Sequence, residues 1–317
     1  MAARLVLAMR VQSRRLLAPD VVELVFRHRS GRPLQSWQPG AHVDLHLPDG
    51  RIRQYSLCGT PADGQSWRIA VKRVDAGRGG SQWIHDHLLA GSDAWVSAPR
   101  QAFRLPAQAR RVLLVAGGIG ITPIKPMAEE LARRDADFVL HYCVRTRRDA
   151  VYAEELARHC GARLVLHVSD EGSRIDDYAS LLAPFAADGC VCCCGPAGLM
   201  EAVANGARAV CLAPERLRVE HFSAAADETL VPEPFQVRFT SSSAVLEVGA
   251  DESLLVALHR AGHVVPAVCQ SGVCGTCECP YVSGAVLHRD RCLEPEQRER
   301  SLTACVSRAT GTLLLDL

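Results

Sequence analysis

The chain has 317 residues, of which 48% are hydrophobic, and its 36 basic and 35 acidic side chains leave a formal net charge of +1. A chain of this length exceeds one ordinary hydrophobic core, so we expect two or three globular domains. A net charge this close to zero provides no bulk field for binding nucleic acid or an anionic membrane surface. No apolar stretch approaches the roughly 18 residues that a membrane-spanning helix needs. We therefore expect a protein that binds neither nucleic acid nor membrane.

The fourteen cysteines bear on the compartment. In a secreted chain they would suggest a disulfide framework. The N-terminal segment MAARLVLAMRVQSRR, however, has only a short apolar run and no A-x-A-like cleavage site, which is typical of a first strand rather than of a signal peptide. We expect a reducing, cytoplasmic location, where clustered cysteines bind metal or remain buried thiols.

The first hundred residues predict an antiparallel β-barrel. Apolar and polar residues alternate in several short segments separated by Pro- and Gly-containing turns, namely 21–28, 42–47, 53–59 and 67–75. Short strands at this spacing favour a small barrel. We assign residues 1–106 to this domain.

From about Arg111 the pattern changes to strands that alternate with helices. The predicted strands are 111–116, 137–144, 163–170, 189–196 and 216–222, with helices after the first, second and fourth. Such alternation is typical of βαβ units on a parallel sheet. We assign residues 107–226 to an α/β domain.

Residues 223–234 are small, polar and proline-containing, as expected of a linker. The following residues predict two strands and a helix before a cysteine-rich loop. Residues 227–317 are therefore assigned to the linker and a third domain.

The cysteine-rich loop, CQSGVCGTC, has the spacing of a plant-type [2Fe–2S] site. Its cysteines follow a C-x4-C-x2-C pattern, and a fourth follows in TACVSR; the predicted ligands are Cys269, Cys274, Cys277 and Cys305. Zinc sites instead favour paired C-x2-C or C-x2-H elements, and Cys305 has no such partner. The glycines of the loop suit a backbone that wraps closely around a cluster. Cys279 falls outside the spacing and is interpreted as a packed thiol.

This loop, together with HRD at residues 288–290 and CVSRA, resembles the C-terminal ferredoxin domain of the phthalate dioxygenase reductase family. The resemblance extends over essentially the whole chain, although the gap from Cys277 to Cys305 is slightly shorter than the family usually has. It implies a flavin barrel, an α/β nicotinamide domain and an α+β, β-grasp ferredoxin domain, in that order. It also implies FMN, a [2Fe–2S] cluster and NADH as cofactors.

Two segments predict a flavin site. RQYSL (53–57) matches the R-x-Y-S motif of ferredoxin-reductase-like flavin domains, and the resemblance implies that Arg53 pairs with phosphate, Tyr55 packs on the flavin and Ser56 bonds near its reactive edge. A glycine-rich turn before a helix-like segment is a second phosphate-binding feature. The further predicted contacts are Leu57, Val71, Lys72, Gly79, Gly80 and Ser81.

The segment GGIGITP (117–123) follows a strand and precedes a helix. It departs from the full G-x-G-x-x-G pattern because Pro123 stands at the position of the last glycine. It matches the nicotinamide motif of the ferredoxin reductase superfamily, which implies that the turn meets the pyrophosphate and that Thr122 reaches toward the flavin. The predicted contacts here are Gly117, Gly118, Gly120, Thr122 and Pro123.

CGP, at the end of a later strand, is the second nicotinamide marker. Ligands of open parallel sheets bind at the carboxyl ends of strands, so Cys194, with Gly195 and Pro196, is expected to approach the nicotinamide. The resemblance implies that Glu220 and Phe222 close the site. Core packing is expected for the preceding cysteines, Cys190, Cys192 and Cys193.

The choice of nucleotide depends on CVRTRRDA. Its arginines, Arg145, Arg147 and Arg148, could bind the 2′-phosphate of NADPH or form a solvated turn. Family habit favours NADH, with NADPH possible.

These motifs predict an electron path. NADH gives two electrons together whereas a [2Fe–2S] cluster accepts one, so a flavin between them is the expected converter. No nucleophile–base pair is found, and the histidines at 85, 87 and 221 are interpreted as surface or packing residues. We expect a monomeric NADH-dependent reductase whose partner, a terminal Rieske oxygenase of an aromatic demethylase or dioxygenase system, docks near the cluster loop. The alternatives are a reductase with another acceptor such as a cytochrome or free flavin, a redox-sensing binding protein, and a zinc-containing flavin reductase.

Overall fold

A computed structural model describes residues 5–75, 77, 79–106, 110–222 and 233–317. The chain divides into two compact units, Met1–Glu220 and His221–Leu317. None of the helices in the described ranges combines the length and apolar character needed to cross a bilayer. Most of the predicted linker lies outside the described residues, apart from its last two positions.

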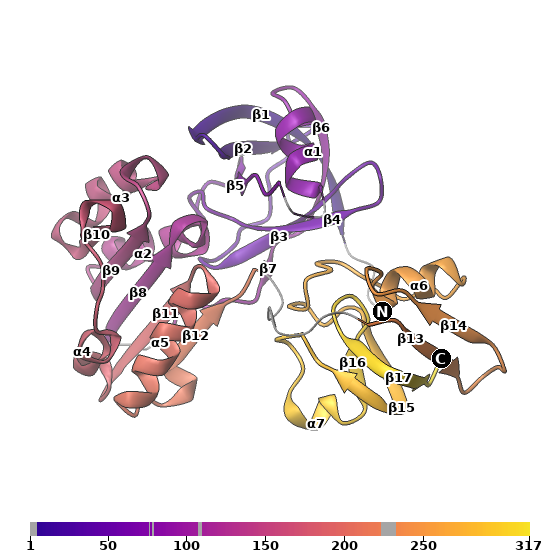
Figure 1. The fold of residues 1–317 in the computed structure, drawn as a ribbon. Helices are drawn as coiled ribbons and strands as arrows, with labels where there is room; N and C mark the ends of the chain where they lie inside the picture. The colour runs from indigo at the N-terminus through magenta and orange to yellow at the C-terminus, as the bar shows by residue number, and fades with distance from the viewer. Residues whose placement is uncertain (1–4, 76, 78, 107–109, 223–232) are drawn as a thin grey trace. The chain divides into compact units, whose positions relative to one another are not determined.

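The first half of the larger unit is an antiparallel barrel (Figure 1), as predicted. Its strands run in the order β4-β3-β6-β1-β2-β5, with β7 paired to β3. A bridge between Leu57 and Ile69 joins the end strands β4 and β5. The elements are β1 (Val6–Ala18), β2 (Val21–His28), β3 (Ala41–His46), β4 (Ile52–Ser56), β5 (Trp67–Lys72), α1 (Gly80–His87), β6 (Asp93–Ser97) and β7 (Arg100–Gln101). The N-terminal segment thus forms a strand.

The second half of this unit is a parallel five-stranded sheet in the order β10-β9-β8-β11-β12. Apolar cores lie on both of its faces, one against α2 and α3 and the other against α4 and α5. The strand order reverses between β8 and β11, which makes their carboxyl ends the topological switch point of the sheet. The strands are β8 (Arg111–Gly117), β9 (Asp137–Val144), β10 (Leu164–Val168), β11 (Gly189–Cys194) and β12 (Leu217–Glu220), and the α-helices are α2 (Ile121–Arg133), α3 (Ala153–Cys160), α4 (Tyr178–Leu182) and α5 (Ala197–Ala209).

The smaller unit is an α+β fold with a five-stranded sheet in the order β14-β13-β17-β15-β16. Its central pair, β13 and β17, is parallel and the remaining pairs are antiparallel, as in a β-grasp fold. Helix α6 contributes Leu254, Leu255 and Leu258 to the core. The elements are β13 (Phe235–Phe239), β14 (Val245–Val248), α6 (Leu254–Arg260), β15 (Glu278–Leu287), α7 (Pro295–Arg298), β16 (Ser301–Thr303) and β17 (Arg308–Leu315).

One buried arginine fastens the start of β13 to the rest of this sheet. The Arg308 guanidinium donates to the carbonyls of Glu252, Glu233 and Gly249 at 2.5, 2.6 and 3.0 Å. It also lies 5.0 Å from the centre of the Phe235 ring. The buried guanidinium thus joins the segment just before β13 to the turn between β14 and α6.

We expect Arg308→Met to lower the free energy of unfolding of the smaller unit by about 3 kcal/mol, since it removes three charge-assisted bonds made by a buried guanidinium. The measurement is urea denaturation followed by the visible absorbance of the cluster. Arg260→Met is the matched control, because Arg260 is exposed and pairs with Glu252 at 3.0 Å; its expected cost is below about 1 kcal/mol. Equal costs would refute the role of Arg308.

Candidate functional site

The four cysteines predicted as cluster ligands gather in the smaller unit, between α6 and β15 and just after β16. Contacts with the Cys274 thiol and, to a smaller extent, the Cys305 thiol hold the pKa of Cys269 below its ordinary value. The Cys305 thiol likewise lowers the pKa of Cys277. The backbone amide of Ser271 donates to the Cys269 sulfur at 3.3 Å. The pKa values of their partners Cys274 and Cys305 are raised, so two of the four sulfurs, those of Cys269 and Cys277, favour the thiolate form.

The spacing of these sulfurs fits a two-iron cluster better than a single zinc ion. Four thiolates at 2.3 Å from one zinc ion lie roughly 3.8 Å apart. In the described part of the chain, however, no three of the four sulfurs lie within 4.8 Å of one another. The contacts between the sulfurs form a chain, from Cys274 to Cys269, from Cys269 to Cys305 and from Cys305 to Cys277, and this spread suits ligands shared between two metal ions. The residues fit a [2Fe–2S] cluster.

The cluster loop depends on glycine, as expected. Gly272 and Gly275 have φ values of 67° and 68°, a left-handed conformation that favours glycine. A Cβ at Gly275 would lie 3.8 Å from the sulfur of Cys292. Cys292 is thus a fifth thiol beside the loop, which sequence reasoning missed because its position in the chain has no ligand spacing. Cys279 lies in the core, consistent with a packed thiol.

The HRD segment and the residue after it are bonded to the backbone around the cluster loop. The Asp290 carboxylate accepts from the Leu293 amide at 3.0 Å and from Arg298 at 3.3 Å, and it is buried. The Arg291 amide donates to the Gly272 carbonyl at 2.8 Å. This segment therefore holds the backbone that carries the predicted ligands.

In the larger unit, Arg53 and the glycine-rich turn meet, as the phosphate prediction requires. A Cβ at Gly80 would overlap Nε of Arg53, and a Cβ at Gly79 would lie 2.6 Å from Nη1 of Arg51. Gly79 precedes helix α1 with a φ of 69°, so the amides at this helix N-terminus lie beside two guanidinium groups. Such a cradle fits a phosphate group. Sequence reasoning missed Arg51 because it lies outside R-x-Y-S; in this structure its Nε donates to the Asp49 carboxylate at 2.7 Å.

The side chains of the other predicted flavin residues differ in their burial and in their hydrogen-bond partners. Tyr55 packs against the barrel core, and the Ser56 hydroxyl is 3.5 Å from Oε2 of Glu220. The side chains of Leu57 and Val71 are fully buried in the barrel core. Two residues are committed to local bonds: Lys72 pairs with Asp20 at 3.3 Å, and the Ser81 hydroxyl accepts from the Val74 amide at 3.0 Å.

The nicotinamide turn and the CGP segment are packed backbone to backbone at the switch point. A Cβ at Gly117 would lie 2.6 Å from Cδ of Pro196, and one at Gly120 would overlap the Cys194 carbonyl. A Cβ at Gly195 would lie 3.0 Å from the backbone of Gly117. Glycine is required because any side chain would separate the two turns. The structure thus brings these predicted residues together.

The residues at the start of α2 are buried. The Thr122 hydroxyl donates to the Ile119 carbonyl at 3.0 Å, so in this structure it serves the helix start. Pro123 stands in the first turn of the helix, where its missing N–H leaves no bond unmade. Gly118 has a φ of 49°.

Of the cysteines on β11, Cys192 and Cys193 pack in the cores on opposite faces of the sheet, as expected. Cys194 is buried at the carboxyl end of this strand, and the neighbouring β12 places Glu220 in register beside it. Burial raises the pKa of Glu220 to about 8, and the bond from Ser56 opposes that rise. Phe222 is 43% exposed and belongs to the smaller unit, and its role stays a prediction.

Arginines after β9 are partly neutralised. Arg147 donates to both carboxylate oxygens of Glu171, at 2.9 and 2.5 Å. The carbonyl of Arg145 accepts from the Asp170 amide at 3.1 Å. Two acidic residues therefore lie beside the segment where a 2′-phosphate would need positive charge.

We expect Cys274→Ser to abolish the broad visible absorbance of the cluster, because it removes one of the thiolates that the site would supply. Iron and sulfide analysis of anaerobically purified protein checks this. Cys279→Ser, at a core position, is the matched control and should keep the full iron content. A control variant that also loses iron would show that Cys279 is a ligand.

Glu220 gives a prediction of pH dependence. A carboxyl with a pKa of about 8 when folded and 4.5 when unfolded binds its proton more tightly in the folded state. Stability is therefore lost as the pH rises between these values. We expect Glu220→Gln to exceed the wild type in free energy of unfolding by roughly 3–5 kcal/mol at pH 9 and to differ little at pH 4.5.

Denaturation of the holoprotein from pH 4.5 to 9, followed by flavin fluorescence, measures this difference. Glu171→Gln is the control, since Glu171 is an exposed carboxylate paired with Arg147, and it should change stability by less than about 1 kcal/mol at every pH. Parallel curves for Glu220→Gln and the wild type would contradict the raised pKa.

Comparisons with known proteins agree with this geometry. Residues 114–205 match the oxidoreductase NAD-binding domain, and residues 238–310 match the 2Fe-2S iron-sulfur cluster binding domain. The chain is 43% identical, over 98% of its length and 99% of the relative's, to the heme-dependent oxidative N-demethylase beta subunit of Ectopseudomonas mendocina. It is 40% identical, over 97% and 98%, to the vanillate O-demethylase oxidoreductase of a Pseudomonas species.

The solved structure of phthalate dioxygenase reductase, described as a modular structure for electron transfer from pyridine nucleotides to [2Fe–2S], superposes with a TM-score of 0.81 at 33% identity and covers 98% of both chains. The predicted fold and cofactor classes are thereby confirmed. The chain belongs to the phthalate dioxygenase reductase family, as an NAD(P)H-dependent oxidoreductase that uses FMN, a nicotinamide nucleotide and a [2Fe–2S] cluster.

Proposed function

We propose that this chain is the NADH-dependent reductase component of a cytoplasmic Rieske oxygenase system, an aromatic demethylase or dioxygenase. The observation that carries the proposal is that a phosphate cradle, a nicotinamide turn and four cluster-type cysteines occur on one chain. When bound, the flavin accepts a hydride and releases single electrons, which the cluster passes on. The chain acts as a monomer, divided at residues 1–106, 107–226 and 227–317.

We assign the following roles to the residues of the flavin and nicotinamide sites. Arg53, Arg51 and the amides before α1 hold the flavin phosphate. The turn at 117–123 binds the nucleotide pyrophosphate, with Cys194 against the nicotinamide. The oxygens of Ser56 and Glu220 are 3.5 Å apart, where the barrel strand β4 meets the sheet. We assign these two polar side chains to the position between the flavin and the nicotinamide.

NADH is the proposed nucleotide. Glu171 takes up the charge of Arg147 through two bonds. A 2′-phosphate placed there would break this pair and meet the carboxylate at close range. The negative charge of Glu171 therefore favours NADH, whose ribose has no 2′-phosphate, over NADPH.

The partner is proposed to dock near the cluster loop, since electron transfer needs a short path from the four cysteines. Loop residues 270, 271 and 273–276 are partly exposed, so a partner can approach the cluster edge here. A haem centre is the second candidate acceptor. The relative with 43% identity is the beta subunit of a heme-dependent oxidative N-demethylase, whereas another with 40% identity is a vanillate O-demethylase oxidoreductase.

The test reduces the holoprotein with NADH without oxygen and mixes it, in separate stopped-flow runs, with a purified Rieske oxygenase and with a purified haem oxygenase. We expect the Rieske absorbance to bleach at a rate that saturates with oxygenase concentration, and the haem band to change at least about tenfold more slowly, a difference of about 1.4 kcal/mol in activation free energy. Cys274→Ser should abolish both reactions while NADH still bleaches the flavin.

A faster reaction with haem would assign the chain to a haem oxygenase. Negligible oxidation of NADH with every acceptor, combined with binding of a target in one redox state only, would instead identify a redox sensor. Equal rates with NADPH would contradict the proposed nucleotide preference.

A further inference from the structure

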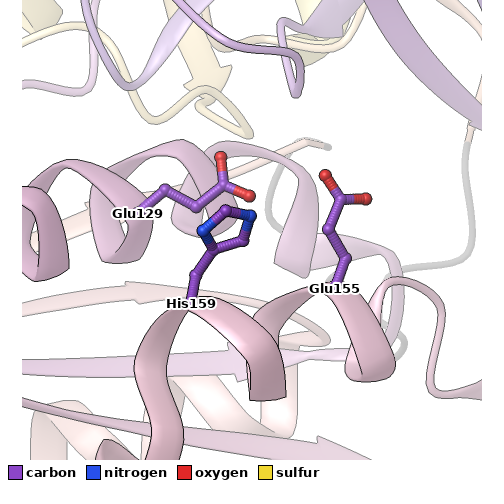
Figure 2. Close-up of side chains that lie close together, drawn as sticks. All are labelled: Glu129, Glu155 and His159. Carbon is purple, nitrogen blue, oxygen red and sulfur yellow. The ribbon is translucent and has the colours of Figure 1, made fainter.

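Three metal-binding side chains converge on the larger unit, away from the sites above (Figure 2). Glu129 on α2 and Glu155 and His159 on α3 each bring one ligand atom to within 4.8 Å of the others. The two glutamates are half-buried and His159 is exposed. Such a group would suit a divalent cation if its charge were unbalanced.

The negative charges of Glu129 and Glu155 are already balanced by Lys125. The ammonium group of Lys125 lies 2.6 Å from Oε1 of Glu129 and 2.9 Å from Oε1 of Glu155. Arg68 adds a second positive charge, 3.6 Å from Glu155. A divalent cation would therefore have to displace or repel two groups that are in place. The cluster is better explained as the surroundings of a buried lysine.

The third bond of Lys125 crosses to the barrel. An ammonium group has three N–H donors, and the third is accepted by the Cys58 carbonyl at 3.2 Å. Cys58 lies two residues beyond Ser56 at the end of the R-x-Y-S strand, and Lys125 lies two residues beyond Pro123 of the nicotinamide turn. Lys125 is buried, so all three donors are satisfied without solvent.

A second set of bonds also links the barrel to the α/β half of the larger unit. The Tyr152 hydroxyl donates to Glu23 of β2 at 2.9 Å and lies 3.4 Å from the Cys58 sulfur. Tyr152 has a φ of 64°, a conformation that costs a bulky residue free energy. Arg68 of β5 lies 3.6 Å from both Glu23 and Glu155. Each of these groups joins the barrel to the sheet.

We propose that Lys125 is a positioning residue for hydride transfer: through the Cys58 carbonyl it fixes the nicotinamide turn against the flavin strand. This inference rests on the proposed electron path. Burial is the largest single influence on the pKa of Glu155 and raises it, but the bond and charge of Lys125, together with the charge of Arg68, hold this pKa below its ordinary value. A buried ammonium has a directional bond for each donor, whereas an apolar contact would let the two halves slide.

The test compares Lys125→Met with the charge-balanced variant Lys125→Met/Glu129→Gln, which removes one positive and one negative charge. Arg133→Met is the matched control, because Arg133 lies on the same helix and pairs with Glu130 at the surface at 2.8 Å. Flavin and iron contents are measured first. Anaerobic stopped-flow then gives the limiting rate of flavin reduction and the half-saturating NADH concentration, and the long-wavelength charge-transfer absorbance reports stacking of nicotinamide on flavin.

We expect both Lys125 variants to reduce the limiting rate about 10- to 100-fold, as a displacement near 1 Å would, with the half-saturating concentration changed less than about threefold. The charge-transfer absorbance should weaken. In nucleotide-free protein, hydrogen exchange should increase in both 56–60 and 119–128. Arg133→Met should change none of these.

A lower melting temperature with an unchanged limiting rate and charge-transfer band would overturn the proposal, because Lys125 would then be only structural. The charge-balanced variant decides the question if Lys125→Met alone fails to fold. Failure of the wild type to oxidise NADH would instead refute the proposed function.

Discussion

The nicotinamide half of the protein depends on two turns that touch through their backbones. Gly117, Gly120 and Gly195 leave no room for a Cβ between the end of β8 and the end of β11. This contact keeps the two turns together at the switch point, and the pairing of β11 with β12 sets Cys194 beside Glu220. The site's chemistry follows from it, because a buried carboxyl at this position keeps its proton to a higher pH and lies next to the Ser56 hydroxyl of the barrel.

A backbone contact places the two turns but cannot hold the barrel against the sheet. Barrel residues such as Ala18, Val21 and Ala70 share an apolar core with α2, and beside this core lies a set of matched charges. Lys125 and Arg68 face Glu129, Glu155 and Glu23, and Arg15 lies 3.1 Å from Glu23. Buried ion pairs contribute little net stability but fix geometry well. This suits a reaction in which donor and acceptor must be held at a defined distance. The cluster site does not depend on this boundary. Its predicted ligands, three from a short loop and Cys305 after β16, belong to a separate unit with its own core.

Sequence reasoning succeeded where local chemistry has a fixed spacing. The C-x4-C-x2-C ligands must come from a tight loop, and strands such as β13 show a clean alternation, so both were predictable. Strands β15, β16 and β17 were not predicted, because β15 has an exposed run and its register with β17 shifts twice. Lys125 was missed because a lysine on an amphipathic helix normally faces solvent. Arg51 and Cys292 approach their sites only through folding, and no spacing marks them.

The central claim is that electrons from NADH reach the cluster through the flavin on this one chain. The most direct measurement is an anaerobic titration of the purified protein with NADH, followed by visible absorbance and by electron paramagnetic resonance at low temperature. The account predicts that the flavin bands and the broad cluster absorbance both bleach and that the signal of a reduced [2Fe–2S] cluster appears. Bleaching of the flavin alone, with zinc found by metal analysis, would contradict it.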